Sequence, residues 1–311
     1  MRVLVTGGTG YLGSAIVRAL SAGGHHPVVF ARRASQSASS GAEAVDGDIR
    51  DEAALRRAAT GVDAIVHTAA LVSIWHPRPS TFDEVNVGGL ERILAVARRA
   101  GIQRIVYTSS FLALPPADGE LPLTANDYQR TKVRAGAIAR DAIAAGAPLV
   151  SLVPGVVYGP GRLTEGNLIG RMIGEHLAGR LPGLIGGDRC WSFAYVDDVA
   201  DAHVQALLPR TDPGEYLLGG ENAPPIRVFE MVKDRVGIPV PRRIPIPLAF
   251  ATAALEEMRA RATRRAPAIT RGVVQIFRHD WSMNSGRSVE KLSYRIRPLA
   301  AGVTTVLSDR W

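Results

Sequence analysis

Val3-Leu4-Val5 is followed at once by Thr6-Gly7-Gly8-Thr9-Gly10-Tyr11-Leu12-Gly13, and this stretch decides the fold. The short apolar run predicts a buried strand. Between positions 11 and 22 an apolar residue recurs at every fourth position, which predicts an amphipathic helix that ends at Gly23-Gly24. The glycines therefore lie in a turn that connects a strand to a helix.

The glycines of this turn have the spacing Gly-x-x-Gly-x-x-Gly. A bound pyrophosphate needs a tight turn, close approach of the backbone and free amide groups at a helix N-terminus. A side chain at either of the first two glycines would obstruct that approach, and one at the third would push the helix away from the strand. The alternative is a structural turn without a ligand. We predict a dinucleotide site that contains Gly7, Thr9, Gly10, Tyr11, Leu12 and Gly13.

The second predicted strand, 27–30, is followed by Ala31-Arg32-Arg33. An acidic residue at this place is the usual partner of the ribose hydroxyls of NAD. Two guanidinium groups would instead pair bidentately with a 2′-phosphate, and we expect no carboxylate to compete nearby. Arg32 and Arg33 thus favour NADP, with NAD as a possible cofactor; the alternative is a pair of solvated surface arginines.

Strands are also predicted at 64–67, 104–107 and 149–153, with a helix at 81–100 between the first two of them. This alternation predicts an α/β fold, a doubly wound parallel sheet of the Rossmann type. Surface loops are expected at 35–41 and 115–122. Beyond residue 159 the alternation is lost and Gly and Pro become frequent. We expect a dinucleotide-binding domain at 1–158 and a smaller substrate-binding lobe at 159–311, interleaved with it.

The composition is that of a globular protein: 46% of the 311 residues are hydrophobic and 21% are charged. The single cysteine, Cys190, excludes an internal disulfide framework and favours a reducing, cytoplasmic setting. The N-terminus has no signal-peptide pattern, and no run of about 18 apolar residues predicts a membrane span. The histidines lack the spacing of a zinc site, so we expect no metal.

The formal charge of +8 raises the question of nucleic acid. The one local excess of positive charge is a cluster of five arginines, and no aromatic residue interleaves it as a stacking surface would need. We therefore expect no nucleic-acid partner. A solvated helix face is the simplest interpretation of the cluster, and an anionic lipid or acidic partner is the alternative. The cluster consists of Arg259, Arg261, Arg264, Arg265 and Arg271.

Several short motifs follow the glycine turn in a fixed order. They are Gly47-Asp48-Ile49, His67-Thr68-Ala69-Ala70, Asn86-Val87-Gly88-Gly89, Tyr107-Thr-Ser-Ser110, Tyr128-Gln-Arg-Thr-Lys132, Pro154-Gly-Val-Val-Tyr-Gly-Pro160 and Tyr195-Val-Asp-Asp-Val199. Together with the glycine turn, these motifs resemble the extended short-chain dehydrogenase/reductase superfamily, to which NAD-dependent epimerases and dehydratases also belong. The nearest resemblance is to its dihydroflavonol-4-reductase-like and 3β-hydroxysteroid-dehydrogenase-like branch.

The resemblance implies roles for further residues. Asp48 and Ile49 are expected to flank the adenine, and Ala69-Ala70 to line the nucleotide groove. Asn86 is expected on the helix that braces the strand carrying Ser110. Pro154, Val156 and Val157 are expected at the nicotinamide carboxamide. The resemblance also implies a carbonyl or secondary alcohol as substrate, and a homodimer is possible.

Tyr128 and Lys132 are four residues apart and share one face of a helix. An ordinary tyrosine ionises near pH 10, too high to take a proton from an alcohol at neutral pH. An ammonium about 4 Å away contributes roughly 4 kcal/mol at a dielectric near 20, enough to lower the pKa of Tyr128 by about 3. We predict Tyr128 as acid and base, Lys132 as its electrostatic partner and ribose ligand, and Ser110, or else Ser109, as the group that orients the substrate oxygen.

The residues that follow Ser110 reduce the number of possible reaction types. Phe111-Leu112 stand where sugar-nucleotide dehydratases of the superfamily carry an Asp-Glu pair, so dehydratase chemistry is disfavoured. We predict an NADP-dependent oxidoreductase that interconverts a ketone or aldehyde and an alcohol. A sugar-nucleotide epimerase with a retained cofactor is the alternative. A non-catalytic dinucleotide sensor would have lost the tyrosine or the lysine, and both are present.

Apolar residues after the fourth strand predict a hydrophobic substrate pocket, although ordinary core is the alternative for each of them. We expect substrate contacts from Leu71, Trp75 and Phe111, with Val72, Ile74 and Phe193 nearby. Asn167 and Tyr195 are candidates for polar contacts with the substrate. The predicted substrate is accordingly a mainly apolar small molecule.

Overall fold

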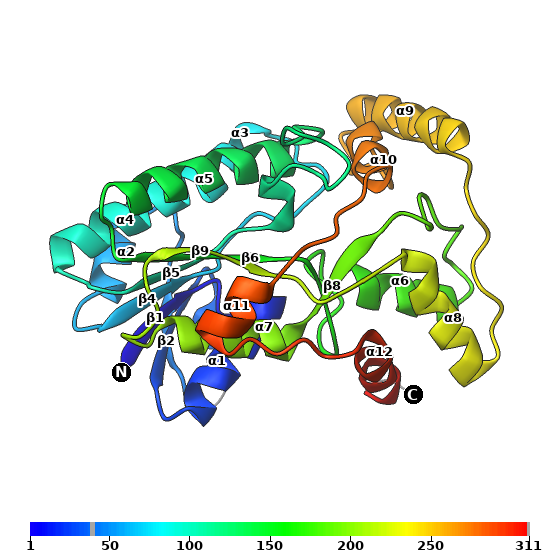
Figure 1. Ribbon diagram of the computed structural model, residues 1–311. Helices are drawn as coiled ribbons and strands as arrows, with labels where there is room; N and C mark the ends of the chain where they lie inside the picture. The colour runs from blue at the N-terminus through cyan, green and yellow to red at the C-terminus, as the bar shows by residue number, and fades with distance from the viewer. Residues whose placement is uncertain (38–40, 310–311) are drawn as a thin grey trace.

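The larger part of the molecule is built on a seven-stranded parallel sheet in the order β3-β2-β1-β4-β5-β6-β9 (Figure 1). The computed structural model describes residues 1–37 and 41–309, so residues 38–40 of the predicted loop at 35–41 lie outside the described residues. The strands are β1 (Arg2–Thr6), β2 (His26–Ala31), β3 (Glu43–Asp46), β4 (Ala64–His67), β5 (Ile105–Thr108), β6 (Leu149–Pro154) and β9 (Gly214–Leu218).

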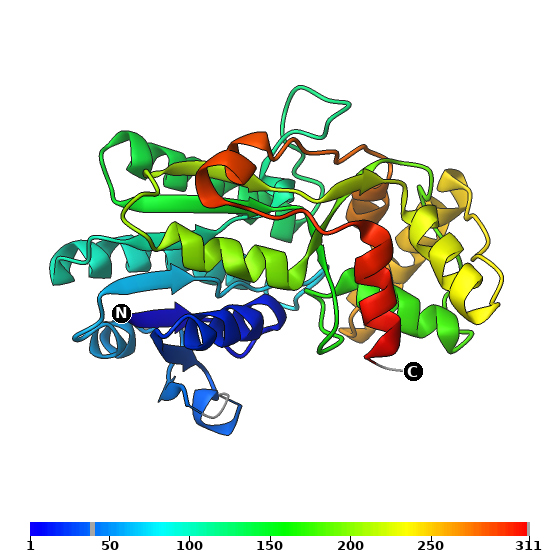
Figure 2. The ribbon, with the colours of Figure 1, turned by 60° about the horizontal axis from the view of Figure 1, so that its bottom comes forward.

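The sheet is covered on both faces, which is why its central strands are continuous apolar runs. On one face α1 (Tyr11–Ala22) packs beside α7 (Val196–Ala206) and α11 (Gly286–Leu292), as Figure 2 shows for α1 and α7. The other face is covered by α2 (Glu52–Ala58), α4 (Gly88–Ala100) and α5 (Asp127–Ala144). The predicted doubly wound Rossmann-type sheet is thereby confirmed.

Four short helical segments lie around the carboxyl edge of this sheet. A 3₁₀ turn, η1 (Ala34–Gln36), follows β2, and a second, η3 (Phe111–Ala113), follows β5. Before α4 the chain forms α3 (Ser80–Phe82) and a π-helical turn, η2 (Asp83–Val87). Because π turns inside helices are rare and are found mostly at functional sites, η2 draws attention to this edge of the sheet.

The smaller part contains a three-stranded sheet in the order β10-β8-β7, with β7 parallel and β10 antiparallel to β8. Its strands are β7 (Val156–Tyr158), β8 (Trp191–Tyr195) and β10 (Glu221–Ala223). Its helices are α6 (Leu168–Leu177), α8 (Pro225–Val236), α9 (Ile246–Thr263), α10 (Arg271–Phe277) and α12 (Leu299–Ser308). A second apolar core, with Tyr158, Phe193 and Phe229 fully buried, lies between them.

The chain passes between the two parts more than once. α7 and β9 come after residue 158, yet β9 pairs with β6 at the end of the large sheet. The larger part therefore takes its last strand from the second half of the sequence. Among the described residues, no helix combines the length and apolar character that a membrane crossing requires.

Candidate active site

The glycine turn between β1 and α1 is held by backbone contacts that leave no room for side chains. Gly7 has a φ of 75°, and a Cβ atom there would lie 2.8 Å from the backbone of Ala69. A Cβ atom at Gly13 would lie 2.2 Å from the carbonyl oxygen of Gly7. Gly10 is the N-cap of α1, and no side chain of the described residues caps this helix end. The first amide groups of α1 are thus available to an anion, as a pyrophosphate requires.

This turn forms one end of a cavity of about 720 Å³ at the carboxyl ends of the parallel strands. The cavity extends past β4 and β5 to β7 and to the smaller part of the molecule. Of the residues predicted to bind the cofactor, all except Arg33 line it: Gly7, Thr9, Gly10, Tyr11, Leu12, Gly13, Arg32, Asp48, Ile49, Ala69, Ala70, Lys132, Pro154, Val156 and Val157.

The two arginines after β2 are separated by the fold. Arg32 lines the cavity, whereas Arg33 is the N-cap of η1 and does not. Arg50, which the sequence analysis did not single out, also lines the cavity. Its guanidinium group donates hydrogen bonds of 3.0 and 2.8 Å to the carboxylate of Asp48. These bonds lower the pKa of Asp48, and the nearby Arg32 lowers it further. The expectation that no carboxylate lies near Arg32 was therefore wrong.

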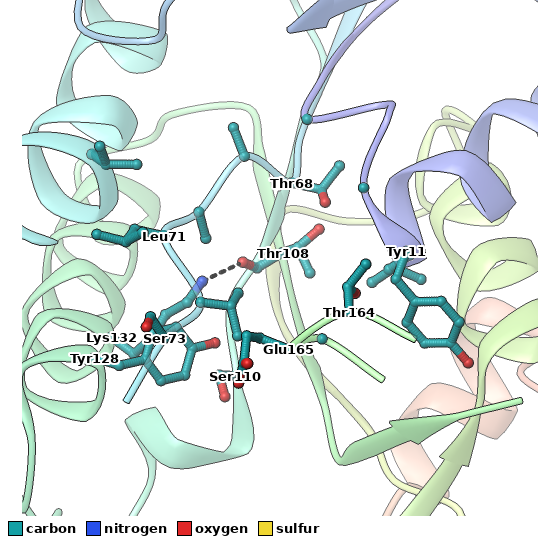
Figure 3. Close-up of a pocket in the computed structure, with 18 of the residues that line it drawn as sticks. Tyr11, Thr68, Leu71, Ser73, Thr108, Ser110, Tyr128, Lys132, Thr164 and Glu165 are labelled. Carbon is teal, nitrogen blue, oxygen red and sulfur yellow. Dashed lines mark hydrogen bonds between the residues drawn. The ribbon is translucent and has the colours of Figure 1, made fainter. Parts of the chain in front are cut away.

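At the other end of the cavity, Ser110, Tyr128 and Lys132 converge from η3 and α5 (Figure 3). Ser110 accepts a bond from the amide of Leu112 at 3.3 Å, and its hydroxyl lowers the pKa of the Tyr128 phenol. The Lys132 ammonium donates to the carbonyl oxygen of Thr108 at 3.2 Å. Its Nζ atom lies 5.9 Å from the centre of the Tyr128 ring. Ser109 also lines the cavity, but the hydroxyl that acts on the pKa of Tyr128 is that of Ser110.

The electrostatics of this trio differ from the sequence-based expectation. Burial raises the pKa of Tyr128 to about 12, and the Ser110 hydroxyl only partly opposes this. Burial also lowers the pKa of Lys132 to about 8. The prediction that the ammonium brings Tyr128 close to neutrality was wrong for this structure, because loss of hydration disfavours the charged form of both groups.

The position of α5 depends on two buried or partly buried amides. Asn126 caps the helix and accepts from the amide of Gln129 at 2.8 Å. Asn86, in the π turn, accepts from the amide of Leu71 at 2.7 Å and donates to Thr131 at 3.0 Å. Asn86 was expected on the helix that braces the strand carrying Ser110, and it lies in the turn that leads directly into α4. Its side chain also ties the segment after β4 to Thr131, the residue beside Lys132.

Of the predicted substrate contacts, Leu71 and Phe111 line the cavity, but Trp75, Asn167 and Tyr195 do not, and neither does Phe193. Asn167 is fully buried and caps α6, accepting from the amide of Gly170 at 3.1 Å and donating to the carbonyl of Gly159 at 3.2 Å. Tyr195 is also buried, with the guanidinium of Arg297 3.8 Å from its ring centre. The amide of Asn167 is already engaged and Tyr195 lies outside the cavity, so the prediction that these two residues contact substrate was wrong.

Sequence analysis missed the side chains that close the apolar end of the cavity. The Trp281 ring meets that of Phe111 edge-on at 5.3 Å, and the Phe277 ring stacks on that of Trp191 at 4.9 Å. Val273 and Ile276, on α10, line the cavity with them. The loop at 115–122 is fixed to the same region, because Asp118 accepts from His279 at 3.0 Å.

The sequence model of the NAD dependent epimerase/dehydratase family matches residues 3–219. The chain belongs to this family. Its members are nicotinamide dinucleotide-dependent enzymes, and the chain is an oxidoreductase of the extended short-chain dehydrogenase/reductase type, as its motifs predicted. The fit of the glycine turn to a pyrophosphate agrees with this assignment.

Individual relatives cover almost the whole chain. Sterol demethylase protein B of Methylococcus capsulatus is 32% identical over 94% of this chain and 93% of its own. The 2-alkyl-3-oxoalkanoate reductase of Stenotrophomonas maltophilia is 30% identical over 81% of this chain and 80% of its own. Among solved structures, that of gox2253 superposes with a TM-score of 0.81 at 30% identity, over 99% of this chain and 97% of the other.

Proposed function

We propose that this enzyme is an NADP-dependent oxidoreductase that interconverts a ketone or aldehyde and an alcohol on a mainly apolar small molecule. The observation that carries the proposal is the convergence of Ser110, Tyr128 and Lys132 on a cavity whose far end is formed by the glycine turn. A proton donor, an orienting hydroxyl and a dinucleotide site in one space are what carbonyl reduction needs.

The residues present fit the dinucleotide. The backbone around Gly7 and Gly13 would hold the pyrophosphate at the start of α1, and Arg32 would meet a 2′-phosphate. Lys132 would bond the nicotinamide ribose. When bound, the cofactor supplies or accepts the hydride.

The proton is handled by Tyr128. With its pKa raised to about 12, the phenol is protonated at neutral pH and is ready to act as an acid toward a carbonyl oxygen. Ser110 would bond and orient the same oxygen. After the proton has left, the nearby Lys132 ammonium stabilises the phenolate, so its charge acts most strongly after the transfer. In the oxidative direction the same groups work in reverse.

The walls around this trio support an apolar substrate. Phe111, Ile276 and Trp281 close the cavity on the side away from the glycine turn. Apolar lining with a few convergent polar groups is typical of small-molecule sites. The relative named 2-alkyl-3-oxoalkanoate reductase acts, by that name, on a ketone with alkyl substituents, which supports the same substrate class.

A panel of ketones, aldehydes, alcohols and UDP-sugars, followed by nicotinamide absorbance and by product chromatography, tests the reaction. Tyr128→Phe is expected to reduce turnover by about 100-fold or more, because proton transfer by a positioned side chain contributes that much. Its affinity for NADPH is expected to stay within a factor of about three. Normal turnover by Tyr128→Phe would contradict the assignment, and conversion of a UDP-sugar without net redox would favour the epimerase.

The cofactor preference is tested by a matched pair of adjacent arginines. Arg32→Ser is expected to weaken NADPH binding by about 10- to 100-fold, the size of a lost charge-assisted bond, with little effect on NADH. Arg33→Ser removes the same charge outside the cavity and serves as the control. Equal affinity of the unmodified enzyme for NADPH and NADH would remove the argument for NADP.

A further inference from the structure

Helix α9 leaves three of its large apolar side chains exposed on the outside of the molecule. Leu248, Leu255 and Met258 are 57, 63 and 58% exposed, and their spacing places them on one face of the helix. The buried positions of the helix are the alanines 249, 253 and 260. Ile246 and Phe250 are partly buried and pack with Ala249 and Ala253. The three exposed side chains lie outside this packing, and their exposure is not what folding alone favours. Figure 1 shows α9 at the outer edge of the molecule, against α10.

The apolar face of α9 has no free acidic side chain beside it. From Ile246 to Leu255 the helix contains no ionisable residue. The two carboxylates that follow are both engaged with arginines: Glu256 binds Arg259 at 2.7 Å, and Glu257 binds Arg271 at 2.9 Å. They also accept backbone amides, those of Ala268 and Arg271. The negative charge of this region is therefore neutralised within it.

Positive charge remains at the C-terminal end of the helix. Arg261, Arg264 and Arg265 are exposed, and within residues 1–37 and 41–309 their guanidinium groups form no ion pair. An apolar helix face that runs into unpaired arginines is complementary to an anionic lipid surface, where the side chains enter the acyl boundary and the arginines meet the headgroups. A second copy of the chain would bring the same positive excess to the interface, so it is the weaker fit.

We propose that α9, with the arginines that follow it, docks this enzyme on an anionic phospholipid membrane. The helix would lie along the membrane surface rather than cross it. The site is linked to the cavity through α10, which packs on α9: Arg278 lies 5.7 Å from the ring centre of Phe250, and Ile276 and Phe277 line the cavity. If the proposed function holds, docking delivers apolar substrate from the bilayer; the docking itself does not depend on it.

The test is flotation of the full chain with vesicles of phosphatidylcholine and phosphatidylglycerol, compared with vesicles of phosphatidylcholine alone. Binding is expected with the anionic vesicles and should weaken with added salt. The double variant Leu255→Ser, Met258→Ser is expected to lower the partition coefficient by about tenfold or more, given the apolar area removed. Its control is Val289→Ser, Ile296→Ser, two exposed apolar side chains (45 and 44%) that lie outside α9.

A second variant tests the positive charge. It replaces Arg261, Arg264 and Arg265 by Gln and is expected to lower the partition coefficient by about tenfold or more. Its control replaces three exposed arginines of other surfaces, Arg57, Arg98 and Arg295, by Gln, with the same change in net charge. Circular dichroism and NADPH binding establish that each variant is folded.

Loss of flotation in both α9 variants, with both controls unchanged, supports docking. The proposal is overturned if the chain does not float, or if the controls lose binding as much as the α9 variants. It is also overturned if Leu255→Ser, Met258→Ser changes only the oligomeric state measured by light scattering, which would assign the face to a second copy. Flotation needs no substrate, so its failure is separate from a failure of the proposed reaction.

Discussion

Lys132 is predicted to make the enzyme active and less stable at the same time. Its ammonium is fully buried, and burial lowers its pKa from 10.5 to about 8. At 1.36 kcal/mol per pKa unit, the charged form costs the folded state about 3 kcal/mol at neutral pH. The hydrogen bond to the Thr108 carbonyl returns about 1 kcal/mol, which would be lost with the side chain.

The perturbation is Lys132→Met, which keeps the length of the side chain and removes the charge. The variant is expected to be inactive and about 2 kcal/mol more stable at pH 7, the difference between the two terms. For a chain of 311 residues this corresponds to a rise in Tm of about 3 °C. Lys233→Met, at an exposed position on α8, is the control and is expected to leave Tm almost unchanged.

The pH dependence separates this mechanism from ordinary repacking. The folded-state pKa of Lys132 lies below its unfolded value, so the unfolded chain binds the extra proton between about pH 8 and pH 10.5. The cost is complete below about pH 8 and disappears as the pH rises toward 10.5. The Tm advantage of Lys132→Met, measured by circular dichroism without dinucleotide, is therefore expected to shrink from about pH 7 to about pH 9.5. A variant that is less stable at pH 7, or an advantage that does not change with pH, would refute the reasoning.

Two further predictions concern the glycine turn and a buried histidine. Gly13→Ala is expected to weaken NADPH binding, measured by fluorescence titration, by about 100-fold, because its Cβ atom would lie 2.2 Å from the Gly7 carbonyl oxygen. Gly166→Ala is the control, because the nearest atom to its Cβ would be 3.6 Å away, and it should bind NADPH normally. Burial lowers the pKa of His203 to about 4 from 6.5, so stability should fall as the pH drops from about 6.5 to about 4, by up to about 3 kcal/mol. The variant His203→Gln can keep the bond to Thr108, and its Tm should fall less steeply over this pH range than that of the unmodified enzyme. If the Tm of the variant falls just as steeply, other groups cause the loss of stability.

The parts of the fold that were predicted correctly are those with a strong local signal. The helix at 11–22 coincides with α1 because its apolar period and its terminal glycines are both local features. β3 and α2 were not predicted. β3 is a short edge strand of mixed composition, Glu43–Asp46, and is mostly exposed, so it lacks the apolar run by which the other strands were found.

The candidate site was predicted well where a motif fixes the backbone and poorly where side-chain direction matters. Arg32 and Arg33 are adjacent and chemically equal, yet only Arg32 reaches the cavity, since neighbouring residues at the end of a strand point to different sides. Asn167 and Tyr195 have polar groups that a substrate could use, but the fold uses them as a helix cap and as a packed ring.

The sequence by itself determined the parallel α/β fold, the dinucleotide cradle and the tyrosine–lysine pair, because each depends on residues a few positions apart. Only the tertiary structure decided what surrounds them. Val273, Ile276, Phe277 and Trp281 reach the cavity from more than 140 positions beyond Tyr128, through contacts that no local pattern encodes. The pKa values of Tyr128 and Lys132 were decided in the same way, because they depend on how much water the whole fold removes from around each group.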